Sequence, residues 1–237
     1  MGLKLVTEPD APAARRILDA AEMLFARHGV NATSVRQITR EAGVNVASVN
    51  YYFGSKDDLA EAVFERVIAR VTADRLAGLK RIVETAEAAG TPPDLAAVVS
   101  SFIEPYMGDG NEDQGVLLAR FILSHRLSPD GATKRIVDTH LNPMAQAYVA
   151  AMAKAAPGVD GTELYWRYLL MVSATVLTST EDRSEDRLRA LSDGRASVAD
   201  RSAARDALVS FAVAGIRAEA GTRFVAGTLE NLETAPE

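Results

Sequence analysis

The side chains with the clearest chemical role lie in the stretch Gly43–Leu59, GVNVASVNYYFGSKDDL. By their spacing, Val46, Val49 and Phe53 share one face of a helix. The opposite face holds small polar and phenolic groups: Ala47, Ser48, Asn50, Tyr51 and Tyr52. In the major groove of DNA an amide pairs with adenine, hydroxyl groups bond base edges, and a methyl group touches thymine. The stretch therefore predicts a short helix that is pressed against DNA.

The helices that must position this face are predicted from the residues before it. A first helix with one apolar face spans Pro12–Gly29, where the glycine ends the run. Thr33 or Ser34 caps a second helix, and Gly43 stops it. The third begins at Asn45 or the residue after it. Two helices joined by a short glycine-containing turn form a helix-turn-helix, and the first helix completes its small core.

A long fourth helix is predicted to follow directly. Ser55 and Asp58 have the spacing of a capping box with Asp in place of Glu. From there the helical pattern continues to about Ala88, and its end is predicted at Gly90 before the Pro92–Pro93 pair. A helix of this length would connect the N-terminal unit to the rest of the chain.

The remainder of the chain also has helical periodicity, and we find no convincing strand alternation or repeat in it. The expected fold class is therefore all-α. We expect a loose arm at Met1–Ala11, loops at Gly108–Asp113 and Glu181–Asp200, and a frayed tail after Gly221. The helices expected beyond Pro93 are Asp94–Tyr106, Gln114–Leu127, Ala132–Ala155 (one helix bent at Pro143, or two), Thr162–Thr180, a short one at Arg187–Leu191, and Arg201–Ala220.

Composition restricts the chemistry further. The chain has 237 residues and no cysteine, which excludes disulfides, zinc–thiolate sites and thiol nucleophiles. His28, His125 and His140 stand in no metal-binding or catalytic motif, and no phosphate-binding glycine loop is present. We therefore expect no enzyme activity, no cofactor and no metal. The most apolar stretch, Tyr165–Leu177, is too short to span a bilayer. With no visible export signal, we expect no membrane association and a cytoplasmic location.

The charge distribution bears on DNA binding. The net charge is −6, but residues 1–60 carry seven basic and seven acidic side chains, so all of the excess lies beyond them. Binding depends on the local footprint rather than on the total charge. An electrically neutral DNA-binding unit predicts weak non-specific binding and a requirement for two units acting together.

The N-terminal part of the chain resembles a known family. Thr33–Leu59, TSVRQITREAGVNVASVNYYFGSKDDL, and the helix Arg15–Val30 before it resemble the DNA-binding domain of TetR-family transcriptional regulators. The resemblance implies an all-helical protein with an N-terminal three-helix helix-turn-helix DNA-binding domain over residues 12–58. A larger helical domain over residues 59–220 would bind an effector and form a homodimer, through a four-helix bundle from Thr162–Thr180 and Arg201–Ala220 of each subunit.

The resemblance also assigns residues to a double-stranded DNA operator. Tyr51, Tyr52 and Lys56 match the family's phosphate contacts. Residues that would face bases or the groove are Ser34, Arg36, Asn45, Ala47, Ser48 and Asn50. Several have structural alternatives: Ser34 and Asn45 as helix caps, Arg36 as a solvated side chain, and Tyr52 as part of the core.

The effector site is predicted less directly. Glu163–Leu177 and Asp186–Gly194 are similar to a subgroup that responds to fatty acids or acyl-coenzyme A. Arg126 or Arg167 would anchor an acidic head group, or would be a solvated or interface arginine. Bulky residues that would line a pocket, or else form plain core, are Phe102, Tyr106, Phe121, His125, Met144, Trp166 and Tyr168.

The predicted function is a homodimeric, ligand-responsive transcriptional regulator. The resemblance favours a repressor that binds a palindromic operator and is released by a small apolar or acyl effector, such as a fatty acyl-CoA. The alternative is a dimeric small-molecule binding protein whose DNA-binding unit is weak or silent.

Overall fold

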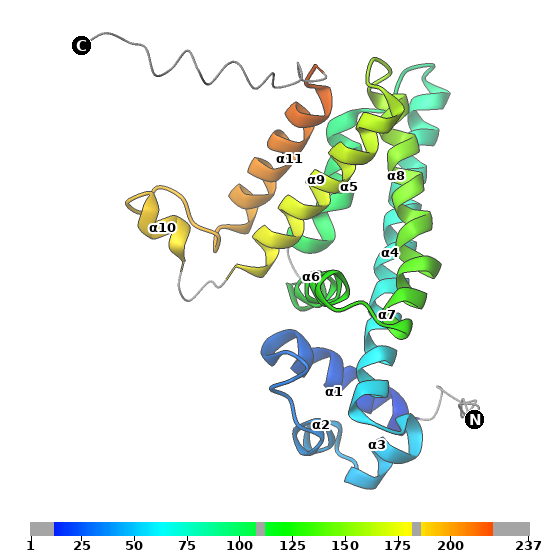
Figure 1. Ribbon diagram of the computed structural model, residues 1–237, viewed down its shortest axis with the longest axis vertical. Coiled ribbons are helices and arrows are strands. Elements are labelled where there is room, and N and C mark those ends of the chain that lie inside the picture. Colours follow the sequence, from blue (N-terminus) through cyan, green and yellow to red (C-terminus); the bar gives the residue numbers. More distant parts are fainter. Residues whose placement is uncertain (1–11, 108–111, 182–185, 220–237) are drawn as a thin grey trace.

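One long helix, α4 (Lys56–Ala88), connects a small group of helices at one end of the molecule to a larger group at the other (Figure 1). The computed structural model describes residues 12–107, 112–181 and 186–219. The small group comprises α1 (Pro12–His28), α2 (Val35–Ala42) and α3 (Val46–Phe53). With 33 residues, α4 is about 50 Å long. The predicted linking helix and its end at Ala88 are confirmed.

The turns of the small group form where the sequence predicts them. Ser34 caps α2: its hydroxyl accepts from the Gln37 N–H, while the Gln37 side chain accepts from the Ser34 N–H. Gly43 ends α2 in the left-handed region (φ 63°, ψ 42°), which a residue with a Cβ rarely adopts. Asn45 then caps α3. The choice between Thr33 and Ser34 is thereby settled in favour of Ser34.

The small group contributes to a buried apolar core that continues into the larger group. Each of its three helices contributes side chains that are completely buried, and so does the start of α4: Ile17, Phe25, Ile38, Val49 and Leu59. The apolar face predicted for α3 is only partly correct. Val49 lies inside and Phe53 is half-buried, but Val46 is 45% exposed. Val46 occupies the first position of α3 and lies outside this core.

The larger group is built from the remaining helices. Within it, α11 packs on α5 and α9, while α8 lies along α4 (Figure 1). Every described element is helical, which confirms the all-α class, and none of the described helices is both long and apolar enough to cross a membrane. The predicted arm and tail lie outside the described residues. The helices of the larger group are α5 (Leu95–Met107), α6 (Glu112–Leu127), α7 (Gly131–Ile136), α8 (Asn142–Ala155), α9 (Gly161–Thr180), α10 (Arg187–Leu191) and α11 (Arg201–Arg217).

Between α7 and α8 the chain forms a π-helical turn, η1 (Val137–Leu141). The Asn142 N–H donates to the Val137 carbonyl, five residues back. Pro143 follows and has no N–H to donate, so the normal i→i−4 ladder is interrupted here. The predicted segment Ala132–Ala155 is therefore two α-helices joined by a wide turn.

The contact between α5 and α6 depends on a glycine. A Cβ at Gly115 would lie 2.6 Å from the Pro105 carbonyl oxygen and 2.9 Å from the Tyr106 Cα, both backbone atoms. Backbone cannot move aside as a flexible side chain can. Gly115 therefore sets how closely α6 approaches the last turn of α5.

We expect Gly115→Ala to lower the free energy of unfolding by about 1–3 kcal/mol, because overpacking must displace backbone. Gly78→Ala in α4 is the matched control, since its Cβ would meet only Arg81 Nη2 at 3.9 Å. Ala favours a helix interior over Gly by up to about 1 kcal/mol, so this control should stabilise. Urea denaturation measures both, and equal effects of the two substitutions would contradict the role given to Gly115.

Candidate nucleic-acid interface

The outer face of α3 is exposed and polar. Asn45, Ala47, Asn50 and Tyr51 are exposed and Ser48 is half-buried, while Val49 anchors the helix from the inside. The Asn45 Oδ1 accepts from the Ala47 N–H at 3.0 Å. Its cap uses only the oxygen, so the amide N–H groups remain available as donors. A helix with this face presents both donors and acceptors to a partner.

Beside α3, the first turn of α2 adds two exposed side chains. The Ser34 hydroxyl is engaged in the capping box and also donates to Gln37 Oε1 at 2.8 Å. Arg36 is exposed. A guanidinium in this position suits either a phosphate or the edge of guanine.

The two tyrosines of α3 differ in exposure. Tyr51 is 69% exposed, and its ring packs edge-on against Tyr52 with centroids 5.0 Å apart. Tyr52 is half-buried and packs against the core. Tyr52 can therefore pack against the core and still contact a phosphate, because the packed ring carries a hydroxyl at its tip.

Lys56 has a structural contact that the sequence did not reveal. Its Nζ donates to the carbonyl oxygens of Val30 at 3.0 Å and Thr33 at 3.2 Å, which fixes the connection between α1 and α2. An ammonium has three N–H donors, so one remains for a phosphate. The same side chain can hold the turn and contact DNA.

Three arginines fasten α1 to the helices that lead away from the interface. Arg66 in α4 pairs with Asp19 at 2.7 Å and with Glu22, and Arg70 pairs with Glu22 at 2.7 Å. Arg120 in α6 donates to the last carbonyls of α1, those of Phe25 (2.9 Å) and Ala26 (3.0 Å). A cation at a helix C-terminus is favourable. Sequence reasoning missed these contacts, and the only local signal was a lone arginine in the apolar run of α6.

The predicted effector residues do not form one site. Phe102, Tyr106 and Met144 are buried together around Arg75, which sequence reasoning did not single out. Phe121 and His125 stack on each other elsewhere, with ring centroids 6.5 Å apart, and His125 Nδ1 lies 3.0 Å from the Thr133 hydroxyl. Tyr168 joins the first cluster through Phe102, at 5.7 Å between centroids.

Three of the other predicted residues have separate neighbours. Trp166 is 61% exposed on the outer face of α9. Arg167 is buried, pairs with Glu163 at 3.2 Å, and donates to the Ile216 carbonyl at 2.6 Å near the end of α11. Arg126 donates to the Ser173 hydroxyl at 3.1 Å. Arg167 therefore ties α9 to α11.

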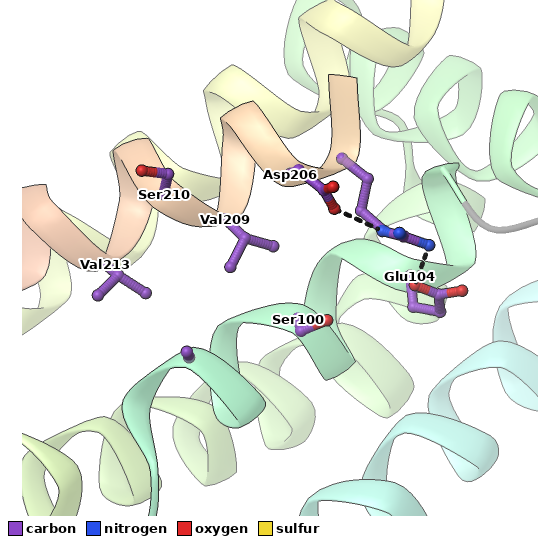
Figure 2. Close-up of a pocket in the computed structure, with 8 residues that line it drawn as sticks. Ser100, Glu104, Asp206, Val209, Ser210 and Val213 are labelled. Atoms are coloured by element: carbon purple, nitrogen blue, oxygen red, sulfur yellow. Dashed lines mark hydrogen bonds and ion pairs between the residues drawn. The ribbon is translucent and has the colours of Figure 1, made fainter. Parts of the chain in front are cut away.

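Several cavities lie beside these elements in the described part of the chain, and two of them border α5, α6 or α11. One of about 560 Å³ lies where the small group meets α6 and α7, and its lining includes Phe25, Phe64, Arg120 and Phe121. The other, of about 470 Å³, lies between α5 and α11 (Figure 2). There Arg205 already pairs with Glu104 and Asp206. Among the described side chains, no group of three or more His, Asp or Glu is placed to hold a metal ion.

This geometry defines the class of the protein: a helix-turn-helix unit is carried by a long helix on a larger helical domain. Residues 17–63 match the family described as bacterial regulatory proteins, tetR family. Residues 100–215 match the tetracyclin repressor-like C-terminal domain. The chain belongs to the TetR family of transcriptional regulators. It is thus a DNA-binding regulator and not an enzyme.

Individual relatives agree. The chain is 31% identical over 157 residues to the HTH-type transcriptional dual regulator CecR of Shigella flexneri, covering 64% of this chain and 67% of that protein. It is 25% identical over 199 residues to BetI of Rhizobium meliloti, covering 76% and 92%. A protein from Saccharomonospora viridis, solved in complex with choline, shares the fold with a TM-score of 0.61 at 18% identity, covering 83% of this chain and 93% of that protein.

We expect Lys56→Met to weaken binding to every DNA duplex and to lower the slope of log affinity against log salt by about 0.9, the value for one phosphate contact. It should also lower the free energy of unfolding by about 1.5–3 kcal/mol, because two charge-assisted hydrogen bonds are lost. Fluorescence anisotropy at several salt concentrations and urea denaturation measure these effects. Lys80→Met, an exposed lysine in α4, is the control. If the salt slope is unchanged, Lys56 makes no phosphate contact and serves only to hold the turn between α1 and α2.

Proposed function

We propose that the chain is a homodimeric repressor that binds a palindromic operator through α3 and is released by a small apolar or acyl effector. The exposed polar face of α3, mounted on buried Val49, is the observation that carries this proposal. We infer a DNA-binding unit over residues 12–58 and an effector-binding and dimerisation unit over 59–220. The α4 helix runs through this boundary without a break.

The proposed DNA contacts divide by chemistry. Tyr51, Tyr52 and Lys56 would hold phosphates, which positions the unit without selecting a sequence. Selection falls to groups that reach base edges. Arg36 suits guanine and Asn50 suits adenine, while the methyl of Ala47 suits thymine. Ser34, Asn45 and Ser48 complete the proposed surface with hydroxyl and amide donors.

An apolar stripe on α9 supports dimerisation. Its residues recur at helical spacing on one face and stay exposed in the single chain: Trp166, Leu169, Leu170 and Leu177. Phe211 on the neighbouring α11 is 66% exposed. A contiguous exposed apolar surface of this kind is typical of a subunit interface. Two-fold pairing through α9 and α11 would present two α3 helices to half-sites about one helical turn apart.

Effector control would act through α4 and α6. Helix α4 carries the small group, and Arg120 in α6 holds the end of α1. An effector that moves either helix would change the spacing of the two α3 helices. Typical coupling of about 1–3 kcal/mol would shift operator affinity by about 5- to 150-fold. Phe102, Tyr106, Met144, Phe121 and His125 are the proposed effector contacts, with Trp166 and Arg167 nearer to the proposed dimer surface.

The ligand of the Saccharomonospora protein, choline, is a cation. In this chain the aromatic cluster of Phe102 and Tyr106 already surrounds the guanidinium of Arg75. A second positive charge beside it would be repelled. This observation favours a neutral or anionic effector, and an acyl compound fits that requirement.

A second candidate is a dimeric small-molecule binding protein whose DNA-binding unit is weak or silent. The electrical neutrality of residues 1–60 favours it, because phosphate contacts supply most of the non-specific affinity. DNA binding separates this candidate from the first.

Fluorescence anisotropy of the full chain on DNA from upstream of its own gene, against a scrambled duplex, tests the operator proposal. We expect selective, salt-dependent binding. Asn50→Ala should lower discrimination at one base pair by about 1–3 kcal/mol and leave non-specific binding unchanged. Asn142→Ala, which removes an amide at the start of α8, is the control. Equal loss of specific and non-specific binding in Asn50→Ala would contradict a base contact.

Sedimentation velocity tests the dimer. We expect Leu170→Asp to weaken self-association by about 30- to 1000-fold, as for the loss of an interface hot spot, because a carboxylate would be buried between subunits. Leu127→Asp provides the matched control, since Leu127 is still more exposed but lies at the end of α6. A dimer that survives Leu170→Asp unchanged would place the interface elsewhere.

A further inference from the structure

Arg75, near the middle of α4, is a buried cation for which the described residues provide no acidic partner. Only 3% of the residue is exposed. Its Nη2 donates to the Phe102 carbonyl at 2.6 Å, and Nη1 lies 3.8 Å from the Met144 sulfur. The guanidinium carbon stands 4.4 Å from the centre of the Phe102 ring and 4.7 Å from that of Tyr106. No carboxylate of the described residues pairs with it, and its Nε has no hydrogen-bond partner there.

This arrangement leaves part of the charge uncompensated. A guanidinium stays protonated at any physiological pH, so it cannot lower the cost of burial by losing its proton. Two aromatic faces and one carbonyl offset some of that cost. Buried arginines with a structural role normally have a carboxylate as well, as Arg167 does with Glu163. An anionic ligand would compensate the charge that these contacts leave at Arg75.

The described groups in contact with Arg75 and its aromatic neighbours offer hydrogen-bond donors and apolar walls. The hydroxyl of Tyr106 is buried and has no hydrogen-bond partner among the described residues. The Tyr148 hydroxyl lies 3.1 Å from that of Ser101. Burial raises the pKa of Tyr148 and of Tyr168 above the ordinary value, so both phenols remain neutral. The Phe102 ring packs on Tyr148 and Tyr168, with centroids 5.2 and 5.7 Å away.

We propose that Arg75 anchors the carboxylate of an aliphatic acid, with the Tyr106 hydroxyl as a second donor and the alkyl chain against Phe102, Met144 and Tyr168. This inference rests on the proposed effector control and names the class of effector. A guanidinium and a carboxylate form a paired, charge-assisted contact that neither an alcohol nor an ester can match. A free acid fits better than its coenzyme A thioester, because the thioester is neutral where Arg75 needs a negative charge.

The position of the site accounts for its effect on DNA. Phe102, Tyr106 and Met144 are at most 3% exposed, so an acid enters only if α4 separates from α5 or α8. Arg75 belongs to α4, the helix that also carries the helix-turn-helix unit (Figure 1). Binding energy gained at Arg75 is therefore applied to the element whose position sets operator affinity.

Isothermal titration calorimetry of the full chain tests the assignment with octanoate, decanoate and hexadecanoate as probes. Decanol, decyltrimethylammonium and decanoyl-CoA serve as matched neutral, cationic and thioester compounds. We expect the acids to bind and each matched compound to bind at least about 10-fold more weakly than decanoate, the effect of one charge-assisted pair. Equal affinity for decanol and decanoate, or no binding by any of the three acids, would overturn the proposal.

Substitution at Arg75 gives an independent result. Arg75→Met should weaken decanoate binding about 100-fold. Without ligand, its Tm should equal or exceed that of the unchanged chain, because an apolar side chain replaces an unpaired charge. Arg81→Met, at an exposed position of the same helix, should leave decanoate affinity within about twofold. Undiminished binding by Arg75→Met would disprove the anchor. If that variant does not fold, Arg75→Lys and the comparison of decanoate with decanol decide.

Operator anisotropy with the same samples keeps the two proposals apart. Without ligand, the Arg75→Met variant should bind the operator as tightly as the unchanged chain does. Decanoate should release the unchanged chain from the operator but should not release the variant. Decanoate binding without operator release would refute effector control but support the carboxylate site. Operator release by decanol as readily as by decanoate would support effector control and refute the site.

Discussion

The structure depends on the unbroken backbone hydrogen bonds of α4. An α-helix resists bending because each turn would have to give up hydrogen bonds, so its two ends move together. Leu59 and Val63 are buried close to the small group, and Leu79 is buried nearer the other end. Buried side chains at both ends of α4 therefore hold one stiff rod. The relative placement of the two helix groups is a property of this rod rather than of a flexible linker.

Charged contacts add to this constraint at the junction. Arg66 and Arg70 join α1 to α4, and Arg120 joins the end of α1 to α6. Lys56 holds the following turn. Some of these contacts are ion pairs and others are hydrogen bonds to carbonyls at helix ends. Together they fix the orientation of α1 relative to α4 and α6, beside the 560 Å³ cavity between the groups. The junction therefore combines packed side chains, charged contacts and an open cavity.

Local signals in the sequence predicted the helices well, because caps and glycine turns act over three or four residues. Ser34, Asn45 and Ser55 each cap a helix and Gly43 ends one. At Ser55 only half of the predicted capping box forms, because the Asp58 carboxylate bonds the Ser55 hydroxyl. Contacts between distant segments were not predictable in this way. Arg75 reads as one more charge on a helix until Phe102 and Met144, 27 and 69 residues away, are seen to enclose it. The predicted effector residues lie in separate parts of the structure for the same reason. An aromatic residue in the sequence indicates that its side chain is buried, but it does not indicate which residues surround it.

The π-helical turn η1 adds one residue to what would otherwise be a regular helix from α7 into α8. It brings His140 to within 2.6 Å of Glu65 on α4, while Arg135 one turn earlier pairs with Glu61. Each residue removed from a helix rotates everything after it by about 100°. Because η1 already takes up one extra residue, a single deletion there would restore the regular helix and leave the following face of α8 against α4. The same deletion within α8, which has no residue to spare, would turn the part of the helix that follows it away from α4.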